Sequence, residues 1–255
     1  MSNAIPAEIN PKGYGHILDM LEDAVATYGD KPAYTSILQT FTYAQFGQMV
    51  DDFSSYLASL EGLEPGDRVM VQMPNLMAAP VTFLSIWKAG FVPVPANPLY
   101  TAREIRNVIE DSGAKAIIAF RSATFTDETL AGTGIIHRVA VARTDCHPAP
   151  KKWIVDLALQ LRKTPPLGDL PTGAVGFREA MKRGRGLPTP NAERASDQLA
   201  LLQYTGGTTG VSKGATLLHR NILANVLQND AWLQPALKKP PHVDQLFIVC
   251  ALPLY

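Results

Sequence analysis

The sequence predicts an α/β fold in which a mostly parallel sheet carries helices on both faces. Apolar runs of strand length alternate along the chain with segments of helical periodicity, and the links between them are short. Such alternation is typical of βαβ units, whose parallel strands are covered on both sides. The 255 residues, 46% of them hydrophobic and 18% charged, suffice for one large domain or two small ones.

Apolar spacing and capping residues predict the helices. Residues 17–28 have helical spacing and end before Gly29. Thr42 with Gln45, and Thr101 with Glu104, match the capping box, in which the two side chains satisfy free backbone N–H groups at a helix start. In chain order, the predicted helices are 17–28, 43–60, 77–88, 102–112, a short one at 177–182, and 220–232.

Apolar runs between turn residues predict the strands. Prolines in the second run, 91–95, favour an edge position or an irregular end. Phe83 and Trp87 are interpreted as packing residues and not as cofactor contacts. The interval 164–195, rich in proline and glycine, is expected to be a mobile surface excursion. The predicted strands are 68–73, 91–95, 115–120, 135–141, 199–204, 215–218 and 246–252.

Composition excludes several classes of protein. The 23 basic and 23 acidic residues balance, so no basic stripe points to a nucleic-acid partner. Cys146 and Cys250 offer no disulfide framework, which favours a reduced, cytoplasmic setting. No apolar run reaches the ~18 residues that a membrane-spanning helix needs, and the N-terminus lacks the apolar core of a signal peptide.

Residues 151–163 form an amphipathic pattern. On a helix, Lys152, Asp156, Gln160 and Lys163 share a narrow polar face, with basic residues at both ends. The helix could lie in a membrane interface with its apolar side down, or pack that side on the domain. The membrane-contact candidates are Trp153, Ile154, Leu157 and Leu161.

A glycine-rich segment, Thr205–Gly214, holds four glycines, three threonines and one lysine between two apolar runs. Glycines let successive amides turn inward around anionic oxygens, and hydroxyls and Lys213 add donors and charge. The segment therefore predicts a polyphosphate site rather than a ligand-free hairpin. Its members are Tyr204, Thr205, Gly206, Gly207, Thr208, Thr209, Gly210, Val211, Ser212, Lys213, Gly214 and Ala215.

The P-loop of nucleotide hydrolases is a poor match. In that motif a lysine follows the second glycine and precedes Ser or Thr, and a helix comes next. Here Lys213 precedes a glycine, and residues 215–218 look like a short strand. The phosphate would lie in a loop between two strands.

The segment YTGGTTGVSKGA (204–215) resembles the phosphate-binding signature of the adenylate-forming superfamily, which includes the acyl-CoA synthetases. Flanking segments resemble the bacterial long-chain fatty acid–CoA ligases. They are QMPNLMAAPV (72–81), KAGFVPVPANPLYTAREI (88–105), LLHRNILAN (217–225) and ALPLY (251–255). Many superfamily members have Pro-Lys-Gly where this chain has Ser212-Lys213-Gly214, a change that makes the loop less rigid.

The resemblance implies an enzyme that joins a fatty acid to the α-phosphorus of ATP and then passes the acyl group to coenzyme A, with Mg²⁺ assisting. It also implies that residues 1–255 are the N-terminal portion of the large domain. The catalytic, ribose-binding and metal-binding residues are then expected beyond Tyr255, and the 255 residues alone are expected to be inactive. Peripheral association with the inner face of the cell membrane fits such an enzyme, and a homodimer is left open.

Two candidate residues near the segment have competing interpretations. His219 is expected to flank the next helix rather than act as a general base, and Tyr255 to approach the acyl or adenylate pocket. Two alternative functions also stay open, namely an aryl- or short-chain acyl-CoA ligase and a non-catalytic nucleotide-binding or membrane-docking domain.

Overall fold

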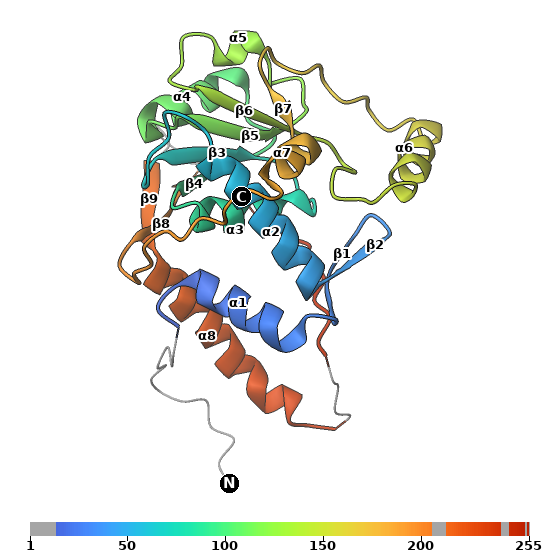
Figure 1. Ribbon diagram of the computed structural model, residues 1–255, viewed down its shortest axis with the longest axis vertical. Coiled ribbons are helices and arrows are strands. Elements are labelled where there is room, and N and C mark those ends of the chain that lie inside the picture. The colour runs from blue at the N-terminus through green and yellow to red at the C-terminus, as the bar shows by residue number, and fades with distance from the viewer. Residues whose placement is uncertain (1–13, 206–212, 241–244, 253, 255) are drawn as a thin grey trace.

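A five-stranded parallel sheet, in the order β4-β3-β5-β6-β7, forms the centre of the molecule (Figure 1). The computed structural model describes residues 14–205, 213–240, 245–252 and 254. The strand β4 lies at one edge, as its prolines predict. The strands are β3 (Arg68–Gln72), β4 (Val92–Pro95), β5 (Ala116–Phe120), β6 (His137–Val141) and β7 (Val175–Gly176).

Helices cover both faces of this sheet, which confirms the predicted fold class. Successive strand residues alternate between two cores, because side chains in a strand point to opposite faces. Val69 and Val71 belong to the core under α2 (Tyr43–Ala58), α3 (Ala78–Lys88) and α7 (Phe177–Gly184). Met70 belongs to the core on the other face, under α4 (Ala102–Ser112), and α5 (Asp127–Leu130) contributes Leu130 to it.

The remaining elements surround this body. Figure 1 shows α1 and α8 side by side below the sheet, β8 and β9 at its left, and α6 with the β1–β2 hairpin at its right. The bounds are α1 (Ile17–Tyr28), β1 (Pro32–Ser36), β2 (Gln39–Thr42), α6 (Lys151–Leu161), β8 (Leu199–Thr205), β9 (Lys213–Leu218) and α8 (His219–Leu237).

Both predicted capping boxes are present. The Gln45 amide donates to Thr42 Oγ1 at 3.2 Å, and the Thr42 amide donates to Gln45 Oε1 at 3.1 Å. Thr101 and Glu104 make the same reciprocal pair at the start of α4. These local contacts explain why the starts of α2 and α4 agree with the prediction.

The predicted strand 246–252 is wrong. Within the described residues, 245–252 form no strand, and Phe247, Ile248 and Val249 are exposed. An apolar run becomes a strand only where a neighbouring chain segment accepts its backbone hydrogen bonds. The β1–β2 hairpin, by contrast, is not predicted, because its alternation is short and mixed in polarity.

The interval 164–195 is not simply a surface excursion. Its residues 175–184 form β7 and α7, and Phe177 and Ala180 are fully buried. The glycine at 184 allows this packing, since a Cβ there would lie 1.8 Å from the backbone oxygen of Asp52 in α2. The helix α8 also runs past the predicted end at 232, with Pro235 inside its last turn.

Candidate functional site

The strands β8 and β9 pair antiparallel and hold the two ends of the glycine-rich segment together. Thr205 lies opposite Lys213, and Tyr204 opposite Gly214. Residues 206–212, between these ends, lie outside the described residues, as does the side chain of Thr205. A strand, β9, begins within the segment at Lys213, and α8 begins only at His219, so a strand lies on either side of residues 206–212, as predicted.

Tyr204 anchors the end of β8 to α4. Its ring is buried in the core beneath that helix, and its hydroxyl donates a hydrogen bond to Asp111 Oδ2. Burial and then the contact with the Asp111 carboxylate raise the pKa of Tyr204 above its usual value, so the hydroxyl stays a donor at neutral pH. Tyr204, at the start of the glycine-rich segment, is therefore held in place by the contact between its side chain and Asp111.

Gly214 allows the opposite strand to approach the Tyr204 ring. A Cβ at Gly214 would lie 3.1 Å from Cζ and 3.2 Å from Cε2 of that ring. Only a residue without a side chain fits this spacing unless the ring moves. One glycine of the segment thus has a packing role that its sequence position alone does not reveal.

The other end of β8 is fixed to α3. Trp87 Nε1 donates to the carbonyl oxygen of Ala200 at 2.6 Å, and Phe83, one turn earlier, packs against the core. Both residues thus pack as predicted. Hydrogen bonds at Ala200 and at Tyr204 hold β8 at two points along its length.

His219 flanks the start of α8, as expected, and is buried against His16. Each residue is 3% exposed, and the centroids of the two rings are 3.5 Å apart. Burial, and then the charge of Arg194, lower the pKa of His16 to about 4; burial, and then the neighbouring His16, lower the pKa of His219 to about 3. Both rings are therefore neutral at pH 7, and they pack the first residue of α8 against the N-cap residue of α1.

The contacts that position the segment were not found from the sequence. Asp111 and Tyr204 are 93 residues apart, and Trp87 and Ala200 are 113 apart. No local pattern marks such pairs, because only packing brings them together. Tyr255, a further candidate, lies outside the described residues.

Across the described ranges, no group of three or more His, Cys, Asp or Glu side chains is placed to hold a metal ion. Lys213, the charged residue of the segment, is exposed at the start of β9.

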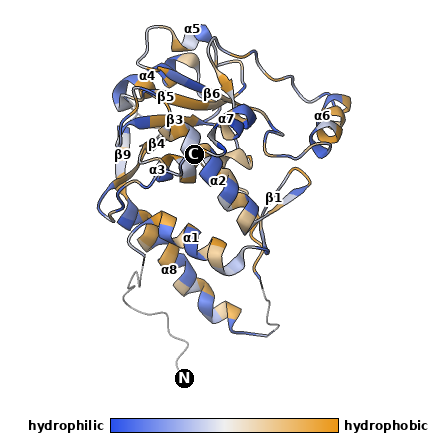
Figure 2. Ribbon diagram, viewed as in Figure 1, coloured by the Kyte–Doolittle hydropathy of each residue, from blue (hydrophilic) through white to orange (hydrophobic). Residues whose placement is uncertain are grey.

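The helix α6 presents its apolar face to solvent. Its exposed apolar side chains are between 57% and 77% exposed, and Figure 2 shows the helix standing away from the body. Part of the predicted polar face lies on the inner side with the buried Val155: Lys152 Nζ is 2.5 Å from Asp156 Oδ2, and Thr144 Oγ1 donates to Asp156 at 2.7 Å, whereas Gln160 and Lys163 are exposed. The exposed apolar residues are Trp153, Ile154, Leu157 and Leu161.

None of the helices in the described part of the chain has the length and apolar character to span a membrane. The four exposed apolar residues of α6 are the predicted membrane-contact residues.

The family model described as AMP-binding enzyme matches residues 21–255. A long-chain-fatty-acid–CoA ligase of Escherichia coli O6:H1 is 38% identical over 253 residues, which cover 98% of this chain and 44% of the relative. A long-chain-fatty-acid–CoA ligase of Bacillus subtilis is 31% identical over 236 residues, covering 91% of this chain and 41% of the relative. The chain thus spans less than half the length of these relatives.

Solved structures agree with the fold. The anthranilate CoA ligase AuaEII, in complex with anthranoyl-AMP, superposes with a TM-score of 0.66 at 20% identity, over 84% of this chain and 37% of that one. The N-terminal domain of FACL13 from Mycobacterium tuberculosis gives 0.58 at 25% identity, over 82% of this chain and 46% of that one.

Proposed function

This chain belongs to the AMP-binding enzyme family, and from that premise we propose that it is the N-terminal portion of an AMP-forming acid–thiol ligase that activates long-chain fatty acids. The full reaction has two steps. A fatty acid carboxylate attacks the α-phosphorus of ATP and releases pyrophosphate. The sulfur of coenzyme A then takes the acyl group and AMP leaves.

One observation carries the proposal: the glycine-rich segment spans the ends of two paired strands, with Thr205 opposite Lys213. Attack on the α-phosphorus requires the β- and γ-phosphates to be held in line and their charge to be neutralised. Backbone amides and the hydroxyls of Thr205, Thr208 and Thr209 would donate to the phosphate oxygens, and Lys213 would add a positive charge. Magnesium bound to ATP would neutralise further charge.

The choice of a long-chain acid rests on the relatives. Ligases that bear that description are 38% identical over nearly all of this chain. The structural neighbour named for anthranilate is 20% identical, and that level of similarity concerns the fold alone. A long-chain acid is therefore favoured over an aryl or short-chain acid.

The test uses the full-length ligase that contains this chain, with pyrophosphate exchange into ATP as the measurement. Replacing Thr208, Thr209 and Lys213 together by alanine should lower the exchange rate with palmitate at least ~100-fold, because several phosphate donors are lost at once. Thr216→Ala, on the exposed side of β9, is the matched control and should keep wild-type activity. Wild-type turnover and ATP affinity in the triple variant would refute the proposal.

Substrate class is tested by comparing palmitate with benzoate and acetate in the same assay. Faster exchange with benzoate or acetate would support the aryl- or short-chain alternative. We also infer that residues 1–255 alone do not complete the reaction, since the relatives are more than twice as long. Release of AMP by the 255-residue chain in the presence of palmitate and ATP would contradict this inference.

We propose in addition that α6 attaches this cytoplasmic enzyme to the inner face of the cell membrane. The supporting observation is that four large apolar side chains of α6, Trp153, Ile154, Leu157 and Leu161, are exposed, while the half-buried pair Lys152–Asp156 and the buried Val155 lie toward the body. Lys151, Arg162 and Lys163 stand at the helix ends, where they would meet anionic headgroups. Membrane docking without catalysis is the second candidate function.

A further inference from the structure

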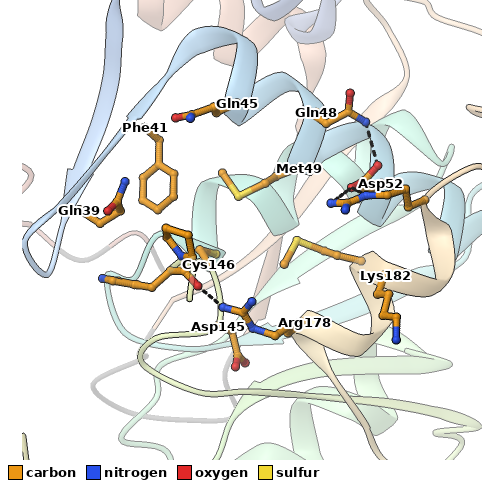
Figure 3. A pocket seen from close by; sticks show the side chains of 14 residues that line it. Gln39, Phe41, Gln45, Gln48, Met49, Asp52, Asp145, Cys146, Arg178 and Lys182 are labelled. Atoms are coloured by element: carbon orange, nitrogen blue, oxygen red, sulfur yellow. Dashed lines mark hydrogen bonds and ion pairs between the residues drawn. The ribbon is translucent and has the colours of Figure 1, made fainter. Parts of the chain in front are cut away.

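A cavity of about 480 Å³ lies between α2, α7, the β1–β2 hairpin and the loop 145–148 (Figure 3). Its volume falls within the roughly 300–1,000 Å³ of small-molecule sites. In Figure 1 these elements lie on the right, whereas β8 and β9 lie on the left. None of the residues that line the cavity belongs to β8 or β9.

One side of α2 and one side of α7 line the cavity, with the same spacing of residues. The residues from α2 have spacings i, i+3, i+4 and i+7, and those from α7 and its C-cap repeat that spacing. Such spacing places side chains on one side of a helix. The lining residues are Gln45, Gln48, Met49 and Asp52 from α2, and Arg178, Met181, Lys182 and Arg185 from α7.

The floor is apolar. Phe41 and Met181 are buried there, and Met49 and Cys146 are half-buried beside them. Burial raises the pKa of the Cys146 thiol to about 12, so this residue behaves as a small apolar group. The floor would pack against an aromatic ring or a short aliphatic chain.

The charged side chains around the floor differ in whether they already have a hydrogen-bond partner. Arg185 donates twice to Asp52 Oδ2, at 3.0 and 2.9 Å, so that buried carboxylate is already paired. Arg178 donates through Nη2 to the carbonyl of His147. Among the described residues, no hydrogen-bond partner is found for Nε or Nη1 of Arg178, and Lys182 adds a second cation on the same side of α7. The Asp145 carboxylate, which accepts from the Ala142 amide, also lines the cavity and interacts with the charge of Arg178.

A buried polar atom without a partner also lies in the cavity wall. His147 is 1% exposed, and its Nε2 lies 2.9 Å from the carbonyl oxygen of Ile37, which makes Nε2 the donor and Nδ1 an acceptor. Within the described ranges, Nδ1 has no hydrogen-bond partner. Buried acceptors in folded proteins are nearly always satisfied by protein, water or ligand. A water or a hydroxyl substituent of a ligand, and not an oxyanion group itself, would have to donate to Nδ1.

We propose that this cavity binds a small organic oxyanion, with an apolar ring or short chain on the Phe41–Met49–Met181 floor and its carboxylate or phosphate on the guanidinium of Arg178. Guanidinium groups pair with both oxyanions through parallel hydrogen bonds. The Gln39 and Gln45 side chains at the opposite wall add polar contacts for substituents of the ring. The proposal is independent of ATP binding and of ligase activity.

Isothermal titration of the protein with three probes of similar size tests the proposal: benzoate, phenyl phosphate and benzyl alcohol, without ATP. Saturable binding of at least one anion is expected, at least tenfold tighter than that of benzyl alcohol. The anion that binds more tightly shows whether the cavity prefers a carboxylate or a phosphate. Equal binding of benzyl alcohol, or no saturable binding of either anion, would overturn the proposal.

Three variants locate the binding, each checked for folding by its melting temperature. Arg178→Gln should weaken anion binding at least tenfold. Met49→Trp, which fills the floor and leaves Arg178 in place, should also weaken it, so the test does not depend on the Arg178–His147 contact. Arg183→Gln is the control, because Arg183 pairs with Glu179 on the same helix and does not line the cavity.

Binding that Arg178→Gln and Met49→Trp leave unchanged would assign the probes to another site, such as an acyl substrate pocket, and would overturn the proposal. An equal loss in Arg183→Gln would also overturn it, as an effect of net charge. The ligase activity of the full-length enzyme in which Thr208, Thr209 and Lys213 are replaced by alanine tests the proposed function and does not test this cavity. The two proposals therefore fail separately.

Discussion

The hydroxyl of Tyr204 donates a hydrogen bond to the carboxylate of Asp111 and so links the last residue before Thr205 to the α4 helix. Gly214 lies against the same ring from the opposite strand. The glycine-rich segment thus begins and ends at a packed aromatic side chain, which fixes the separation of its two ends.

Tyr204→Phe is expected to lower the free energy of unfolding by about 1–2 kcal/mol, since it removes one hydrogen bond to an ionised group and keeps the ring. In the full-length enzyme it should also raise the KM for ATP several-fold, because the segment loses its anchor. Urea denaturation and initial rates measure these effects. Tyr100→Phe is the control, since Tyr100 packs on the same core and its hydroxyl donates to none of the described residues. Equal effects of the two changes would contradict the anchoring role.

Stability is expected to fall as the pH drops from 7 to 5. Folding lowers the pKa of His16 to about 4 and that of His219 to about 3. In the unfolded chain both imidazoles have a pKa of roughly 6.5, so between pH 7 and 5 they bind protons in the unfolded chain but not in the folded protein. Because the unfolded state binds more protons, each histidine lowers the free energy of unfolding by about 1–2 kcal/mol as the pH falls from 7 to 5. The free energy of unfolding rises again when the pH is raised. Urea denaturation at several pH values measures the slope.

Two variants isolate the contribution of the histidine pair to this slope. His219→Gln removes one titrating ring, and His16→Asn removes the other but keeps a side-chain acceptor for the Leu18 amide. Each should flatten the slope between pH 7 and 5, even if overall stability falls. The neighbouring charges Asp19, Glu22 and Arg194 stay in place in both variants. A slope identical to that of the wild type would show that the pair does not cause the pH dependence.

Gly184→Ala is expected to destabilise the protein by about 3 kcal/mol or more, because the new Cβ would lie 1.8 Å from the backbone oxygen of Asp52 and 2.7 Å from the amide nitrogen of Tyr56. Backbone atoms cannot move aside as a flexible side chain can. Gly134→Ala is the control, since the nearest atom would be 3.7 Å away, and it should change stability by less than about 1 kcal/mol. Thermal or urea unfolding decides between these outcomes.

Replacing Trp153 and Leu157 by aspartate should reduce co-sedimentation with phosphatidylglycerol-containing vesicles about 100-fold. Each buried apolar side chain of this size contributes roughly 1.5–3 kcal/mol to such binding. The paired change Trp232→Asp and Leu233→Asp on α8 is the control, since both of those residues are also exposed. Equal loss in both pairs would show that exposed apolar area in general, and not the α6 surface, causes the binding.

Much of the fold could be predicted because its signals are local. The capping pairs Thr42–Gln45 and Thr101–Glu104 lie three residues apart, so the sequence itself places both partners at a helix start. The run 246–252 shows the limit of such signals, because apolar character alone does not supply a neighbouring strand. The burial of α7 depends on Gly184 meeting Asp52, a contact that no local pattern reveals.

By itself, the amino-acid sequence determined the alternation of helices and strands, the caps, and a glycine-rich segment between two strands. The tertiary structure decided that the Tyr204 hydroxyl meets Asp111, that α6 turns its apolar side outward, and that α2 and α7 enclose a cavity with Arg178 at its wall. Propensity, capping and periodicity act within a few residues along the chain. Contacts between residues about 100 positions apart exist only after the whole core has packed.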